Sequence, residues 1–296
     1  MKKMFLPLLL SALLLSGCAG PVSGTPGPSA SPEHTDDVTC GPGVPYSMVC
    51  RIVDTMESGE LLLAELETVG LIPSGTEGVF LLPTDDLDIW LDGEKADVSA
   101  LEDGMPIHIS YRQDFDGSFP APLTEVLTVD AWSLGTEHNP GGGYYDLCGF
   151  YLKVLDDLWQ EDAALNTDIP AVVLDLNEAP GGLTDTEMAA LTWRFAQSHG
   201  VKAVENNKET LIEQGYLIAR PGSKEGQTLY ELTDACLFSI TSHETEELEV
   251  YSLPVLRFDA HKYRGPLAAY WFSDCTAVWP EMGTWSEYQI GAHIIA

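Results

Sequence analysis

The apolar residues change their spacing about halfway along this 296-residue chain, and that change limits the folds it can adopt. Up to Trp132 they come in short runs separated by turn-forming residues, a pattern typical of β-strands. From Leu147 to Trp159 they recur every three to four positions, which predicts an amphipathic helix. Between the two lies Asn139-Pro140-Gly141-Gly142-Gly143, a strong chain breaker. We therefore expect an all-β part, a linker over residues 137–143 and an α+β part.

The first part, residues 48–136, is expected to form a small closed β-barrel. Glu57-Ser58-Gly59-Glu60 predicts a hairpin turn between strands at 49–56 and 61–66, and Asp116-Gly117 predicts a second turn. Five or six short strands without a long helix favour closure, because a closed sheet has no exposed edge. The remaining strands are expected at residues 79–82, 87–91, 107–111 and 123–132.

The second part, residues 144–296, is expected to pack helices on a curved antiparallel sheet. Ala171–Leu176 has the composition of a buried strand. Thr184-x-x-Glu187 matches a capping box and predicts a helix that ends before Gly200. A chain in which helices come first and the strands of a sheet follow is typical of an α+β fold. A short helix is expected at 208–214, and long strands at 237–241, 247–258, 267–279 and 284–295.

The N-terminus has the order of a secretory signal: Lys2 and Lys3 precede an apolar run that ends at Leu15-Ser16-Gly17-Cys18. This tetrapeptide resembles the lipobox of bacterial lipoproteins. The resemblance implies removal of residues 1–17, attachment of lipid such as palmitate to Cys18, and a position on the extracytoplasmic face of the cell membrane. Residues 18–47 are rich in Pro, Gly and Ser, which predicts a tether.

The net charge of the chain limits the classes of partner that it can bind. It has 46 acidic and 14 basic residues, a formal net charge of −32. Such a surface repels phosphate backbones and anionic lipid headgroups, which excludes nucleic acid and electrostatic membrane attachment. No second apolar run approaches the roughly 20 residues of a spanning helix, so the expected membrane attachment is the lipid on Cys18.

The cysteines predict neither a metal site nor a nucleophile. Cys40 and Cys50 lie close enough in sequence to close a small loop, and the sequence leaves open whether they pair. No CxxC or Cys/His ligand spacing occurs, so we expect no structural metal, and nothing indicates a cofactor. Cys148, Cys236 and Cys275 lie in apolar segments and are expected to be small buried hydrophobic residues.

Other resemblances add to the fold expectation. The approach Leu101-x-x-Gly104-Met105 and the segment Phe119-Pro120-Ala121 resemble small OB-like barrels found in lipoproteins of Gram-positive bacteria. The helix order before a curved sheet is similar to the cone-shaped domains of the nuclear transport factor superfamily, which hosts both enzymes and binding modules. The segment Tyr144–Asn166, the strand ending at Asp175, Phe258-Asp259-x-x-x-Tyr263-Arg264 and Trp285-x-x-Tyr288 look like uncharacterised two-domain lipoproteins of Gram-positive gut bacteria.

Two sets of residues are candidates for a site. Asp175 and Glu187 could supply the acid and base of glycan hydrolysis, although both also fit capping roles. Aromatic residues crowd the C-terminal strands, where one exposed face would stack on a sugar ring or an apolar ligand, and packing is the alternative. A cation beside them could hold an anionic ligand or neutralise Asp259. This second set is Tyr263, Arg264, Trp271, Trp279 and Trp285.

These patterns favour a non-enzymatic binding or assembly module at the cell envelope, because no catalytic motif is present. Its partner would be an envelope protein, a glycan or a small molecule. The first alternative is a carboxylate-dependent glycan hydrolase. A weaker alternative is a solute-receptor lipoprotein of an importer, for which the chain lacks two large alternating βα lobes.

Overall fold

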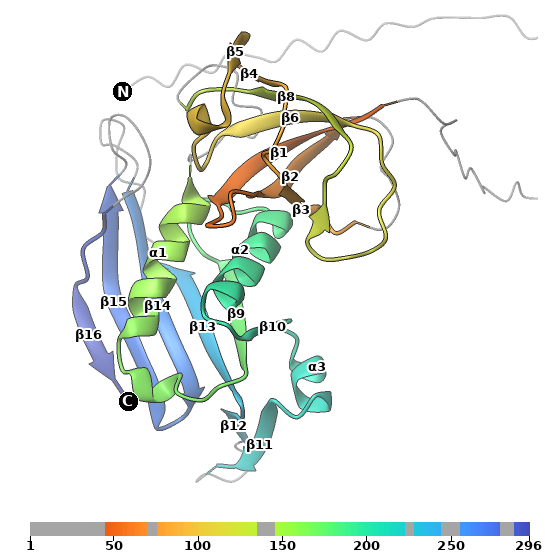
Figure 1. Ribbon diagram of the computed structural model, residues 1–296. Coiled ribbons are helices and arrows are strands. Elements are labelled where there is room, and N and C mark those ends of the chain that lie inside the picture. The colour runs from red at the N-terminus through yellow and green to blue at the C-terminus, as the bar shows by residue number, and fades with distance from the viewer. Residues whose placement is uncertain (1–44, 70–75, 135–145, 223–227, 244–254, 279–286) are drawn as a thin grey trace, which may run out of the picture. The chain divides into compact units, whose positions relative to one another are not determined.

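The computed structural model describes residues 45–69, 76–134, 146–222, 228–243, 255–278 and 287–296 (Figure 1). The chain divides into two compact units, Met1–Gly41 and Pro42–Ala296, and every described residue belongs to the second. The predicted signal segment, Cys18, Cys40 and nearly all of the predicted tether lie outside the described residues. Within the described part, no helix is both long enough and apolar enough to cross a membrane.

The first half of the described chain forms an eight-stranded sheet with the order β5-β4-β8-β6-β1-β2-β3-β7. The predicted first hairpin is confirmed, since β1 and β2 pair antiparallel on either side of the Glu57-Ser58-Gly59 turn. A single 3-10 turn, η1, spans Val98–Ala100. The strands are β1 Tyr46–Thr55, β2 Leu61–Val69, β3 Val79–Leu82, β4 Ile89–Leu91, β5 Glu94–Ala96, β6 Pro106–Tyr111, β7 Ala121–Pro122 and β8 Val126–Ala131.

The expected OB-like barrel is wrong, because this sheet is open. Its edge strands β5 and β7 do not pair with each other in the described structure. Both are very short, three and two residues, so little unpaired edge remains and closure is not needed to protect it. In addition, the central hairpin β1–β2 buries both of its faces, whereas the outer face of a small barrel would be open to water.

The second half forms a six-stranded sheet with the order β10-β9-β13-β14-β15-β16 and a separate hairpin, β11–β12. Together with the first sheet this makes a β-rich α+β fold. The elements are α1 Leu147–Gln160, η2 Ala163–Leu165, β9 Ala171–Glu178, α2 Asp185–Ser198, β10 Lys202–Val204, α3 Lys208–Glu213, β11 Leu217–Pro221, β12 Thr228–Leu232, β13 Ala235–Ser242, β14 Val255–Gly265, β15 Ala268–Val278 and β16 Ala292–Ile295.

This sheet is mixed, so the predicted antiparallel arrangement is confirmed only for the strands from β13 to β16. Strand β9 runs parallel to both of its neighbours, β10 and β13, while β13 to β16 pair antiparallel. Parallel neighbours need a crossover connection of about a dozen residues or more. Helix α2 is that crossover between β9 and β10, and the longer segment from α2 to β12 connects β9 with its other parallel neighbour, β13.

The helices follow their local sequence signals. The predicted helix from Leu147 is α1, and its N-cap Asp146 accepts a hydrogen bond from the Gly149 amide. The predicted capping box opens α2: the Thr184 hydroxyl accepts from the Glu187 amide, and the Glu187 carboxylate accepts from the Thr184 amide. The helix ends at Ser198, and Gly200 follows with a φ of 65°, a conformation in which glycine is favoured.

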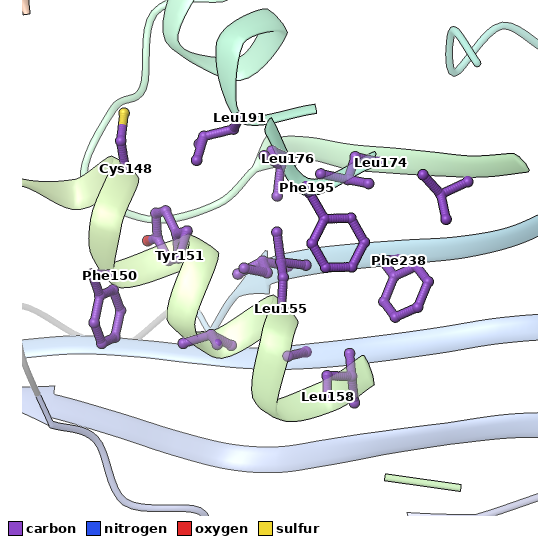
Figure 2. Packing of buried hydrophobic residues seen from close by; sticks show 14 of the residues in the cluster. Cys148, Phe150, Tyr151, Leu155, Leu158, Leu174, Leu176, Leu191, Phe195 and Phe238 are labelled. Carbon is purple, nitrogen blue, oxygen red and sulfur yellow. The ribbon is translucent and has the colours of Figure 1, made fainter. Parts of the chain in front are cut away.

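Helices α1 and α2 cover one face of the six-stranded sheet (Figure 1). Figure 2 shows Tyr151 and Leu155 of α1 in the same hydrophobic cluster as Phe195 of α2 and Phe238 of the sheet. The same hydrophobic cluster also contains residues from the first sheet. The parts of the chain before and after the predicted linker at 137–143 therefore share this core. The residues from the first sheet are Val53, Met56, Leu62, Ala64 and Val79.

Candidate functional site

The predicted acid pair is not brought together. Along β9, Val172, Leu174 and Leu176 pack beneath the helices, so Asp175 points to the opposite face of the sheet. Glu187 lies on α2, on the helix-covered side. Asp175 instead accepts a hydrogen bond of 2.9 Å from the Asn177 side chain. The two carboxylates therefore do not share a cleft that could hold a scissile bond between them.

Glu187 has a structural role that the sequence did not reveal. Its Oε1 lies 2.8 Å from Nε of Arg51, which reaches it from β1. A second nitrogen of Arg51 donates to the Gly104 carbonyl at 3.0 Å. Both charged side chains are buried, with 4% and 5% of their residue surfaces exposed. Glu187 thus caps α2 with one oxygen and neutralises a buried arginine with the other.

The predicted aromatic set lies partly on one face. Tyr263 and Trp271 belong to adjacent strands and both project from the face opposite α1 and α2. Trp271 stacks on His261, with ring centroids 5.7 Å apart and the planes tilted by 16°. Arg264 is half-buried on β14, and Trp279 and Trp285 lie outside the described residues. Among the described members of this set, Tyr263 lines a cavity next to α3.

That cavity lies between the sheet, α3 and the β11–β12 hairpin, and we name it the hairpin pocket. Its volume is about 270 Å³, near the lower end of the usual size of ligand pockets. Five aliphatic side chains form most of its walls, and the aromatic rings of two tyrosines complete them. The lining residues are Val173, Asn206, Lys208, Leu211, Leu217, Tyr230, Leu232, Leu237 and Tyr263.

Polar groups are confined to a few positions of the hairpin pocket. The Tyr263 hydroxyl donates a 2.8 Å hydrogen bond to the Tyr230 carbonyl, and burial raises the pKa of this phenol. The ammonium of Lys208 lies 4.3 Å from the centre of the Tyr230 ring. A hydrogen bond with Tyr230 raises the pKa of Lys208, so it carries a positive charge at neutral pH. The pocket thus combines an apolar interior with one cation.

The sequence did not predict this pocket as a unit. Its residues come from β9, α3 and the loop before it, both strands of the hairpin, β13 and β14, and they converge only after folding. The density of aromatic residues near the C-terminus indicates Tyr263 as a candidate. No local pattern connects it with Lys208 or Tyr230.

Two histidines flank a carboxylate on the same open face. His243 Nε2 lies 2.7 Å from Asp259 Oδ2, and His261 Nε2 lies 4.0 Å from the same oxygen. Asp274 Oδ1 lies 3.6 Å from the other nitrogen of His243. Burial lowers the pKa of His261, which outweighs the opposing effect of Asp259. Across the described ranges, no group of three or more His, Cys, Asp or Glu side chains has the arrangement needed to hold a metal ion.

A second cavity, of about 520 Å³, lies beside the start of α1, and half of its lining residues are aspartates. Burial raises the pKa of Asp146 to about 7, and the nearby charge of Asp103 adds to the shift. Burial also raises the pKa of Asp103. Asp54 on the same wall is paired with Arg194 at 2.5 Å. No sequence signal distinguishes Asp146, because it lies next to a glycine-rich segment and looks like an ordinary helix cap.

Replacing Asp146 with asparagine should make the protein more stable at pH 8 by about 2–4 kcal/mol and leave its stability near pH 4 almost unchanged. The folded-state pKa is raised to about 7, so the folded protein holds a proton that the unfolded chain releases above about pH 4. Stability should therefore fall as the pH rises from about 4 to 7. Asparagine removes this penalty while still capping the helix and tolerating the φ of 53°.

The measurement is urea unfolding of both proteins between pH 4 and 8. Asp168→Asn is the matched control, because Asp168 has a φ of 56° but is exposed. Parallel pH profiles for wild type and Asp146→Asn would show that Asp146 does not have a raised pKa.

The four described cysteines are unsuited to nucleophilic catalysis. Cys50 is a free, fully buried thiol. Cys148, Cys236 and Cys275 are buried as predicted. Burial raises the pKa of all four thiols, which keeps them protonated, and a protonated thiol is a poor nucleophile.

No protein-family model, no curated protein and no solved structure matches this chain.

Proposed function

We propose that this chain is an extracytoplasmic lipoprotein, anchored through Cys18, whose folded part binds a small apolar ligand in the hairpin pocket without transforming it. The observation that carries this proposal is the pocket itself, a cavity of about 270 Å³ with aliphatic walls and few polar groups. Apolar pockets with a small number of placed polar groups are the usual form of small-molecule sites. The lipobox-like tetrapeptide supports the location.

The arrangement of the pocket supports binding better than catalysis. A reaction needs a base, an acid or a nucleophile in contact with the substrate. The hairpin pocket offers a tyrosine whose hydroxyl is engaged with a backbone carbonyl and a lysine that is protonated at neutral pH. Neither group is set up to take a proton from a ligand.

A glycan hydrolase is the second candidate, and the acidic cavity beside α1 is the observation that favours it. The pKa of Asp146 is raised to about 7, so this acid is partly protonated at neutral pH, and it adjoins Asp103. An acid with a neighbouring carboxylate is what glycoside hydrolysis uses. It ranks second because Asp146 already caps α1. In addition, the acid pair predicted from the sequence, Asp175 and Glu187, lies on opposite sides of the six-stranded sheet.

A ligand screen by thermal unfolding tests the proposal. Small apolar and aromatic molecules, amino acids and oligosaccharides would be added to the purified chain. A ligand that binds only the folded state stabilises it by about 2.7 kcal/mol at a hundredfold excess over its Kd. We expect apolar compounds to raise the melting temperature of wild type, and Leu217→Trp to abolish this rise by filling the pocket from its half-exposed wall.

The control variant is Leu267→Trp, a substitution of the same kind at a residue that is 92% exposed and outside the pocket. It should retain the wild-type response. Stabilisation that persists in Leu217→Trp, or a response to oligosaccharides alone, would contradict the assignment of the hairpin pocket.

A further inference from the structure

We propose that the ligand of the hairpin pocket has a hydrocarbon body and one carboxylate end, and that Lys208 binds that end. This inference rests on the proposed function, because it assumes that the pocket is a ligand site. It adds the chemical class of the ligand and the residue that selects it.

The first argument is the way this protein uses its few cations. Of its 14 lysines and arginines, several described ones pair with a carboxylate within 4.0 Å. These are Arg51, Lys95, Lys153, Arg194 and Arg220. Lys208 contacts an aromatic ring and a phenol instead, and in the described part of the chain no carboxylate lies at ion-pair distance from it. Its charge is therefore not cancelled by a direct partner.

The second argument is the position of that charge. Lys208 is exposed at the first residue of α3, and its ammonium lies over the Tyr230 ring that forms part of the pocket wall. Leu211, one helical turn further on, lines the same cavity and is 5% exposed. A ligand with its body against Leu211 would thus have its polar end within reach of Lys208. The Asn206 side chain at the same cavity adds an amide donor.

The third argument is that neither half of such a ligand suffices alone. The net charge of −32 repels small anions, so a bare carboxylate gains little from one exposed lysine. A neutral hydrocarbon gains from burial in the pocket but makes no use of the cation. A molecule with both parts uses the apolar walls for affinity and Lys208 for selection.

Calorimetric titration of the purified full chain with matched probes tests this inference. The probes are 3-phenylpropanoate, its neutral amide 3-phenylpropanamide, and acetate as an anion without a body. We expect the acid to bind about fivefold more tightly than the amide at low salt, the difference to shrink as salt is added, and acetate not to bind. Lys208→Gln should make acid and amide equal, mainly by weakening the acid.

The matched control is Lys202→Gln, which removes an exposed lysine on β10 that does not line the pocket. It should keep the preference for the acid. Equal binding of acid and amide to wild type would overturn this inference and leave the proposed function standing. Absence of binding by both aromatic probes in wild type would overturn the inference together with the apolar pocket function.

Discussion

Replacing Glu187 with glutamine is expected to lower the free energy of unfolding by about 3–5 kcal/mol. The substitution keeps the size of the side chain but leaves the buried guanidinium of Arg51 without its counter-charge. Removing one partner of a buried ion pair is costly, because the remaining charge has neither water nor an opposite charge around it. The capping box of α2 would also lose the charge on its acceptor oxygen.

Denaturant unfolding with a circular-dichroism readout measures this effect. The double variant Arg51→Met/Glu187→Leu is the informative companion, because replacing both charges with apolar side chains often costs little. It should be more stable than the single variant. Glu209→Gln in the first turn of α3 is an exposed control and should change stability by less than about 0.5 kcal/mol. A loss below about 1 kcal/mol in Glu187→Gln would show that the pair is not buried as described.

The ion pair matters beyond its energy, because it connects the two sheets. Arg51 belongs to β1 of the first sheet, and Glu187 belongs to the helix that covers the second. Thr186 adds a hydrogen bond to the Glu65 carbonyl of β2 at 2.6 Å, and Arg194 pairs with Asp54. Helix α2 is therefore fixed to the β1–β2 hairpin by polar contacts near both of its ends as well as by the shared hydrophobic cluster.

Replacing Lys262 with methionine is expected to cost about 3 kcal/mol or more. Lys262 is fully buried, and its ammonium lies within hydrogen-bond distance of the backbone carbonyls of Leu158, Trp159, Glu161 and Asp162. The last carbonyls of a helix have no partner within the helix, and the negative end of its dipole favours a cation there. Methionine fills the space but leaves these carbonyls without a donor in a buried site.

Urea unfolding measures the change in the free energy of unfolding. The control is Lys202→Met, which removes an exposed lysine from strand β10. Hydrogen exchange should localise the effect, with faster exchange in the last turn of α1. A Lys262→Met protein as stable as wild type, with unchanged exchange in that turn, would show that water replaces the ammonium at no cost.

Local signals were sufficient for the helices and the first hairpin. The spacing from Leu147, the Thr184-x-x-Glu187 capping box and the Glu57-Ser58-Gly59-Glu60 turn act within a few residues of the positions they specify. Their hydrogen bonds form between near neighbours in the chain, so their energy depends little on the rest of the fold. For the same reason Cys148, Cys236 and Cys275 could be identified as buried from their apolar surroundings.

The sheets could not be derived in the same way, because pairing between strands distant in sequence leaves no local mark. The run of short strands fits a closed barrel and an open sheet equally well, and the open form is decided by the helices that cover β1 and β2. The parallel pairing of β9 follows from where α2 returns the chain. In the sequence, Arg51 and Lys262 look like ordinary charged positions of amphipathic strands.

The sequence by itself determined where the helices begin and which strands are buried. It also carries two expectations, a lipid on Cys18 and, from the acidity of the chain, a partner other than nucleic acid. Tertiary structure decided which charges are buried together and which side chains surround the hairpin pocket. The physical reason is the separation along the chain over which each interaction acts. Capping, turns and periodicity act between neighbours in the chain, whereas burial of a charge or formation of a pocket depends on distant segments that meet only in the folded protein.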